Sequence, residues 1–170
     1  MEIHNVAALI VAGLACATDL RTRRIPNVLT YSAPLAAIGF SAATAGWAGV
    51  GSALAGWAVG FALFFPLFAL RGLGAGDVKL LAALGAWLGP MPVAVVGIYA
   101  AIAGGVIALA VSFHTGYLRT AFGNIGALLM FWKTVGLRPA PELTLEDASG
   151  PRLAYAVPVL TGLMVMLWLH

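Results

Sequence analysis

Two aspartates stand out among the acidic residues because each lies beside a long apolar segment. Asp19 follows 16 uncharged residues, and Asp77 follows a Gly-Ala-Gly sequence and precedes an apolar run. Two carboxyl groups that lie close together cannot both ionise easily, so they share a proton. One carboxylate of such a pair can activate a water molecule while the other carboxyl group protonates a carbonyl oxygen. The hypothesis from these residues is aspartic-protease chemistry.

The composition indicates that these aspartates belong to a membrane protein. The chain of 170 residues is 62% hydrophobic and 9% charged, with a mean hydropathy of +0.99. Soluble domains are about 45–50% apolar and about 25% charged, and disordered chains have low hydrophobicity. The basic residues are scattered between apolar segments, so no nucleic-acid partner is expected. A single cysteine, Cys16, excludes a disulfide framework and a multi-cysteine metal site, and is expected to be a packing residue.

Four uncharged stretches predict the number of helices: residues 3–18, 25–70, 80–118 and 153–169. A helix needs about 20 apolar residues to cross a bilayer, so the two longest stretches each hold two helices. We expect breaks at the glycines near 46–51 and at the prolines of 89–92. With no basic residue in 1–5, the first helix is expected to stay in the mature protein. We predict an all-α integral membrane protein, one domain over 1–170, with about six transmembrane helices near residues 3–19, 28–45, 52–70, 75–89, 92–113 and 153–169.

The helix lengths predict similar membrane depths for the two aspartates. The uncharged residues before Asp19 extend about 24 Å, less than a bilayer core of about 30 Å, so this helix reaches across only if Asp19 lies at the membrane edge. The helix over 75–89 is also short for a membrane crossing, so Asp77 and Lys79 are expected at the membrane edge as well. Ionisable groups at this depth are costly and usually functional. The alternative is that each aspartate anchors a helix end at the surface, beside Arg21 or Lys79.

The basic residues predict the orientation. With six spans, all nine Lys and Arg residues fall on one side of the membrane. The positive-inside rule places that side in the cytoplasm, so we expect the aspartates near the cytoplasmic face and both termini outside. The long connection 114–152 also lies there. Within it, residues 117–133 are expected to form an interfacial helix, or alternatively a re-entrant or seventh membrane element, and residues 136–151 a polar loop.

The surroundings of both aspartates resemble the type IV prepilin peptidases, intramembrane aspartic proteases with a Gly-x-Gly-Asp motif. Asp19 and the Arg-Ile-Pro-Asn sequence at 24–27 are similar to the first motif of this family. Residues 74–86, which include Asp77, are similar to its second motif. Residues 152–156 are similar to a weaker C-terminal pattern, with Ala154 where proline is common.

This resemblance implies that Asp19 and Asp77 are the catalytic pair. It implies a prokaryotic plasma-membrane endopeptidase that removes the short basic leader of pilin-like precursors (prepilins or pseudopilins) on the cytoplasmic side. The chain has no paired Cys-x-x-Cys motifs, so it resembles the short, peptidase-only branch of tight-adherence (Flp-type) pili, without an N-methyltransferase insert. No cofactor or metal is expected. The expected partners are the precursors and membrane lipid, and the oligomeric state is not predicted.

Five other motif residues are expected to support the site. Gly74 and Gly76 permit positive φ and close approach of a substrate backbone, or simply give a flexible helix start. Lys79 would reduce the charge cost of an ionised pair, or else extend to the membrane surface. Pro26 is expected to start the second helix and Asn27 to cap it, rather than to take part in the chemistry.

Two alternatives remain at this point. The same carboxylates could be ligands in a small ion- or proton-coupled transporter. The protease hypothesis is favoured because the similarity extends well beyond the two acids. The other alternative, a pilus-assembly scaffold that has lost activity, is disfavoured by the presence of both Asp19 and Asp77.

Overall fold

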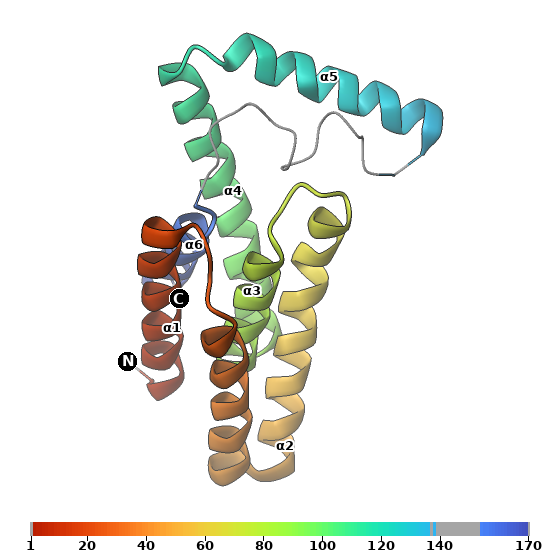
Figure 1. Ribbon diagram of the computed structural model, residues 1–170. Helices are drawn as coiled ribbons and strands as arrows, with labels where there is room; N and C mark the ends of the chain where they lie inside the picture. The colour runs from red at the N-terminus through yellow and green to blue at the C-terminus, as the bar shows by residue number, and fades with distance from the viewer. Residues whose placement is uncertain (1, 137, 139–153, 170) are drawn as a thin grey trace.

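The computed structural model describes residues 2–136, 138 and 154–169, which form six helices and no strand. Five of the helices lie together as an elongated bundle, and α5 lies across one end of it (Figure 1). The all-α prediction is therefore confirmed for the described part of the chain. The helices are α1 (Ile3–Thr22), α2 (Asn27–Ala69), α3 (Ala75–Leu88), α4 (Pro90–His114), α5 (Leu118–Val135) and α6 (Ala156–Leu169).

Glycines mark the two predicted breaks. Gly46 has φ 60° and ψ −145°, and α2 reverses direction there to form two antiparallel arms (Figure 1). The break is narrower than the turn predicted over 46–51, because the residues on either side of Gly46 are helical. Gly89, with φ 84°, separates α3 from α4, and Pro90 occupies the first position of α4. Glycine adopts positive φ at no steric cost, and proline suits a helix start.

Helix α3 lies at the centre of the bundle. Nearly all of its residues from Val78 to Ala86 are buried, as expected for a helix that is apolar all round. The second arm of α2 packs so closely on α3 that a side chain on Gly56 would collide with the backbone of Gly85. A side chain on Gly60 would likewise collide with the Leu81 carbonyl. This tight packing fixes the position of α3, and with it the position of its first turn.

Three helices, α1, α2 and α4, are long and apolar enough to cross a membrane in the described part of the chain. Because α2 is bent at Gly46, its arms extend about 28 Å and about 34 Å at 1.5 Å per residue. Helices α3 and α6 have 14 residues each. Each is therefore about 21 Å long and shorter than a bilayer core of about 30 Å.

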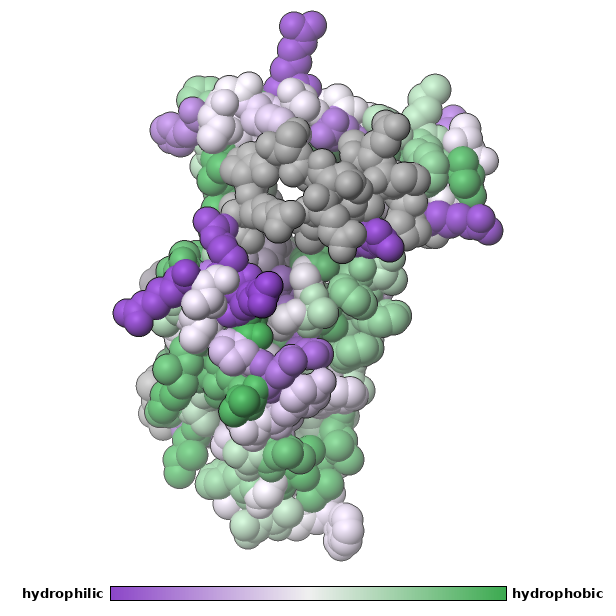
Figure 2. Space-filling model, viewed as in Figure 1, coloured by the Kyte–Doolittle hydropathy of each residue, from purple (hydrophilic) through white to green (hydrophobic). Residues whose placement is uncertain are grey.

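Hydrophilic residues gather toward one end of the molecule. On the face shown in Figure 2, the lower part is mostly apolar and the hydrophilic side chains lie above it. The end of α1 and the start of α3 point toward this end, and α5 lies beyond them, in contact with α4 (Figure 1). The helix predicted over 117–133 is α5, which exposes large apolar side chains at Phe122, Ile125, Leu129 and Met130. Most of the predicted polar loop 136–151, which includes Glu142, Glu146 and Asp147, lies outside the described residues.

Candidate functional site

Asp19 belongs to the buried face of α1. Ala8, Ala12 and Ala15 lie on this face at helical spacing, and Asp19 continues it at only 7% exposure. Cys16 is buried in the same face as a free thiol, so its predicted packing role is confirmed. The Asp19 Oδ2 atom accepts a hydrogen bond from the backbone N–H of Ala156 at 3.3 Å. A buried carboxylate requires such a partner, because its desolvation is otherwise uncompensated.

Asp77 lies in the first turn of α3, just after the N-cap residue Gly74. Its Oδ2 atom accepts a hydrogen bond from the Gly74 N–H at 3.2 Å. A carboxylate at this position satisfies a free N–H group and suits the positive end of the helix dipole. Gly74 has φ −77°, so it does not adopt the positive φ that glycine permits. Gly74 instead leaves space for the Asp77 carboxylate, because a Cβ atom on this residue would lie 2.9 Å from Asp77 Oδ2.

The fold brings the two aspartates to the same end of the bundle. Helices α1 and α3 pack against each other, and the carboxyl groups of Asp19 and Asp77 lie within electrostatic range of each other. Asp77 is partly exposed, whereas Asp19 is buried. A water molecule or a peptide would therefore approach the pair from the side of Asp77.

The two motifs are in direct contact. The Lys79 Nζ atom donates a hydrogen bond to Asn27 Oδ1 at 3.0 Å and lies 5.0 Å from the centroid of the Tyr31 ring. A Cβ atom on Gly76 would lie 3.3 Å from Ile25 Cβ, so this glycine lets the chain before α2 approach the start of α3. The structure therefore joins the start of α2 to the turn that carries Asp77.

The predicted start of α2 needs a correction. Pro26 is the N-cap residue rather than the first helical residue, and its carbonyl accepts hydrogen bonds from the N–H groups of Leu29 and Thr30. Asn27 is the first residue of the helix, and α2 has no side-chain cap. The predicted capping role of Asn27 is wrong, because its amide oxygen is occupied by Lys79.

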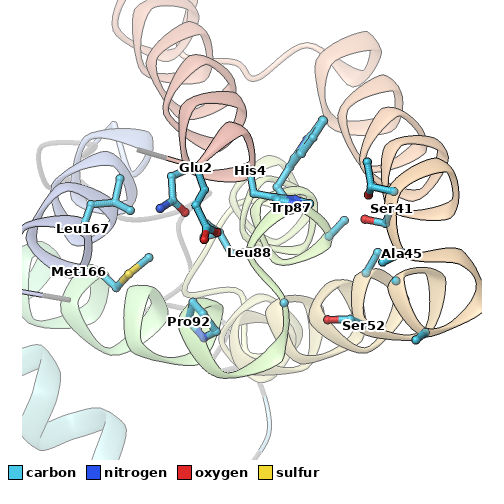
Figure 3. Close-up of a pocket in the computed structure, with 17 residues that line it drawn as sticks. Glu2, His4, Ser41, Ala45, Ser52, Trp87, Leu88, Pro92, Met166 and Leu167 are labelled. Atoms are coloured by element: carbon cyan, nitrogen blue, oxygen red, sulfur yellow. The ribbon is translucent and has the colours of Figure 1, made fainter.

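A cavity of about 870 Å³ lies at the opposite end of the bundle (Figure 3). His4 borders it, and His4 and Asp19 are about 22 Å apart along α1 at 1.5 Å per residue. Among the described side chains, His4 Nδ1 and Trp87 Nε1 are buried without a hydrogen-bond partner. A partly polar cavity of this size accommodates water that can supply such partners. Its lining includes His4, Ser41, Ser52, Trp87, Pro92 and Met166.

Together these features define a class: an apolar helical protein of the membrane type, with two aspartates within electrostatic range at one end of its bundle. The model of the type IV leader peptidase family matches residues 6–109, more than half of the chain. The chain therefore belongs to this family, a family of peptidases, which confirms the resemblance noted from the motifs. Comparison with curated proteins and with solved structures finds no match.

The family match covers every residue predicted for the site. Asp19 and Asp77 lie within it, as do the residues named as their support: Pro26, Asn27, Gly74, Gly76 and Lys79. Within residues 2–136, 138 and 154–169, no three His, Cys, Asp or Glu side chains lie close enough together to hold a metal ion. The contact that sequence reasoning missed is the one from Ala156, which lies outside the matched region. The weak pattern at 152–156 was the only signal for it.

Proposed function

We propose that this protein is an intramembrane aspartic endopeptidase that removes the short basic leader of type IV pilin-like precursors. Asp19 and Asp77 are its catalytic residues. The observation that carries the proposal is their convergence: two carboxyl groups from separate helices lie within electrostatic range at one end of an apolar bundle. Membership of a peptidase family supports the same conclusion and favours proteolysis over ion transport.

The proposed mechanism uses one proton shared by the two carboxyl groups. The ionised carboxylate removes a proton from a water molecule as the water oxygen attacks the carbonyl carbon of the scissile peptide bond. The protonated carboxyl group donates its proton to the carbonyl oxygen, giving a neutral tetrahedral intermediate. The carboxyl group that took the water proton then gives it to the amide nitrogen, while the other carboxylate takes a proton from a hydroxyl group of the intermediate. The C–N bond breaks, which releases the carboxyl group of the leader and the new N-terminal amine and restores the shared proton.

The proposed topology is the one that the basic residues predict. Six segments cross the plasma membrane of a prokaryote, with both termini outside and the aspartates near the cytoplasmic face. The short helices α3 and α6 complete their crossings with the residues that flank them. Helix α5 lies on the cytoplasmic leaflet, which its exposed apolar side chains and its position across the end of the bundle support.

We propose that the leader binds beside Asp77 in an extended form. A protease binds its substrate backbone in an extended form, and the absence of a side chain at Gly74 leaves room beside the Asp77 carboxylate. We propose prepilins and pseudopilins of the tight-adherence (Flp) type as substrates. We also propose that the chain works as a peptidase alone, without N-methylation of the product.

The test is cleavage of a co-expressed Flp-type prepilin by the wild-type protein and by the variants Asp19→Asn and Asp77→Asn. Each variant should lower cleavage by at least about 10³-fold, because the pair acts as a unit, while membrane insertion is unchanged. Glu2→Gln is the matched control, since Glu2 is an exposed acid at the other end of α1. Cleavage is measured as the loss of the leader by mass spectrometry, which also gives the cleaved bond.

Two results would contradict the proposal. Normal processing by either aspartate variant would remove that residue from the chemistry. Aspartate-dependent ion flux in proteoliposomes, without cleavage of any prepilin by the wild-type protein, would favour a transporter instead.

A further inference from the structure

The turn before α6 contacts the Asp19 carboxylate through its backbone. Ala156 is the first residue of α6 and is fully buried, and its N–H group binds Asp19 Oδ2. The first N–H groups of a helix have no partner within the helix. Asp19 supplies one here, so the carboxylate and the start of α6 stabilise each other. The position of this turn therefore affects the position of the carboxylate.

The side chain of Tyr155 holds this turn in place. Its ring meets the ring of Phe64 in α2 edge to face, with 5.6 Å between centroids. It also lies against the backbone of α4 at Gly104, where a Cβ atom would be 2.9–3.1 Å from three atoms of the Tyr155 side chain. The absence of a side chain at Gly104 thus leaves a notch in the surface of α4, and the Tyr155 ring occupies this notch. Tyr155 lies within electrostatic range of Asp77 as well, so the turn is close to both aspartates.

We propose that Tyr155 is a positioning residue for the aspartate pair. Its ring, fixed between Gly104 and Phe64, sets the place of the N–H group of Ala156 that binds Asp19. This inference rests on the proposed peptidase function. It adds α4 and α6 to the active site, although neither helix carries a catalytic side chain.

Two adjacent glycines offer a matched pair of variants. Gly104→Ala places a methyl group in the notch that the ring occupies, whereas Gly105→Ala places one where no atom lies within 4 Å. Both changes favour helix formation equally. Two changes at Tyr155 complete the set: Tyr155→Phe keeps the ring, and Tyr155→Leu removes it. Leader cleavage is measured for each variant as kcat and KM per folded enzyme, beside thermal unfolding.

Gly104→Ala and Tyr155→Leu should each lower kcat by about tenfold or more, the effect of one hydrogen bond to a charged group. KM should stay within about twofold, because no group that binds the leader has moved. Gly105→Ala should match the wild-type protein, and Tyr155→Phe should retain most of its kcat.

A purely structural role would lower the unfolding temperature while kcat per folded enzyme stays at the wild-type value, and that outcome would overturn the inference. Equal kinetics for Gly104→Ala and Gly105→Ala, or equal losses for Tyr155→Phe and Tyr155→Leu, would also overturn it. These outcomes leave the proposed function intact, provided that the wild-type protein cleaves and Asp77→Asn does not. A wild-type protein that cleaves no prepilin would overturn the proposed function and this inference together.

Discussion

Lys79 and Asn27 join the two motifs of the site through a hydrogen bond of 3.0 Å between the ammonium group and the side-chain amide oxygen. Lys79 is two residues beyond Asp77, and Asn27 opens the helix that follows α1. The contact links α3, which carries Asp77, to the start of α2, the helix that follows the one with Asp19. It also explains why a lysine and an asparagine far apart in the chain both occur beside the proposed catalytic residues.

Loss of the hydrogen bond between Lys79 and Asn27 should lower the free energy of unfolding, and the effects of removing either side chain should not add up. Lys79→Met and Asn27→Ala should each lower the free energy of unfolding by about 1 kcal/mol, and the double variant should lose little more than either one. Chemical unfolding in detergent measures all three variants. Lys133→Met, an exposed lysine of α5, is the control and should have no effect. Additive losses in the double variant would show that the two side chains act independently.

Gly74→Ala should impair catalysis without unfolding the protein. The added Cβ atom would lie 2.9 Å from Asp77 Oδ2, and the carboxylate, as the end of a side chain, is what would move. A displacement of about 1 Å can lower the rate by about 10²-fold, so we expect a loss of kcat with an unchanged unfolding temperature. Gly72→Ala in the same connection is the control, because its nearest contact is an ordinary 3.4 Å. Equal activity of the two variants would be evidence against a spatial role for Gly74.

Gly85→Ala should destabilise the bundle. The backbones of Gly85 in α3 and Gly56 in α2 are in contact, so a methyl group would force the helices apart. Overpacking of this kind costs about 1–3 kcal/mol, which thermal unfolding in detergent can measure. The control is Gly51→Ala, where a Cβ atom meets nothing within 4 Å. A Gly85→Ala protein as stable as the control would mean that the two helices separate at little cost.

The proposed orientation can be tested by cysteine labelling, since Cys16 is the single native cysteine. In a Cys16→Ala background, Trp47→Cys should react with an impermeant maleimide in spheroplasts. Trp47 is 89% exposed beside the turn of α2, at the end away from the aspartates. Gly72→Cys should react only after permeabilisation. The reverse pattern would place the aspartates on the outer side.

Local features of the sequence predicted much of the fold. The breaks at Gly46 and Gly89 were predicted because glycine and proline act through the backbone of their own segment. The family was predicted from the two motifs around Asp19 and Asp77. The helix start at Pro26 was less accurate, because the choice of Asn27 as a cap depended on whether a distant lysine would occupy its amide oxygen.

Composition and local motifs by themselves determined that this is an apolar helical protein of a peptidase family with two candidate aspartates. Those properties follow from residue types and short-range spacing. Only the tertiary structure decided which groups meet the carboxylates: Ala156 binds Asp19, and Tyr155 occupies the notch at Gly104. Such contacts join residues far apart in the chain, and their existence depends on how closely the helices pack. No local sequence pattern relates Gly104 in α4 to Tyr155 before α6, and only the packing of the helices brings these two residues into contact.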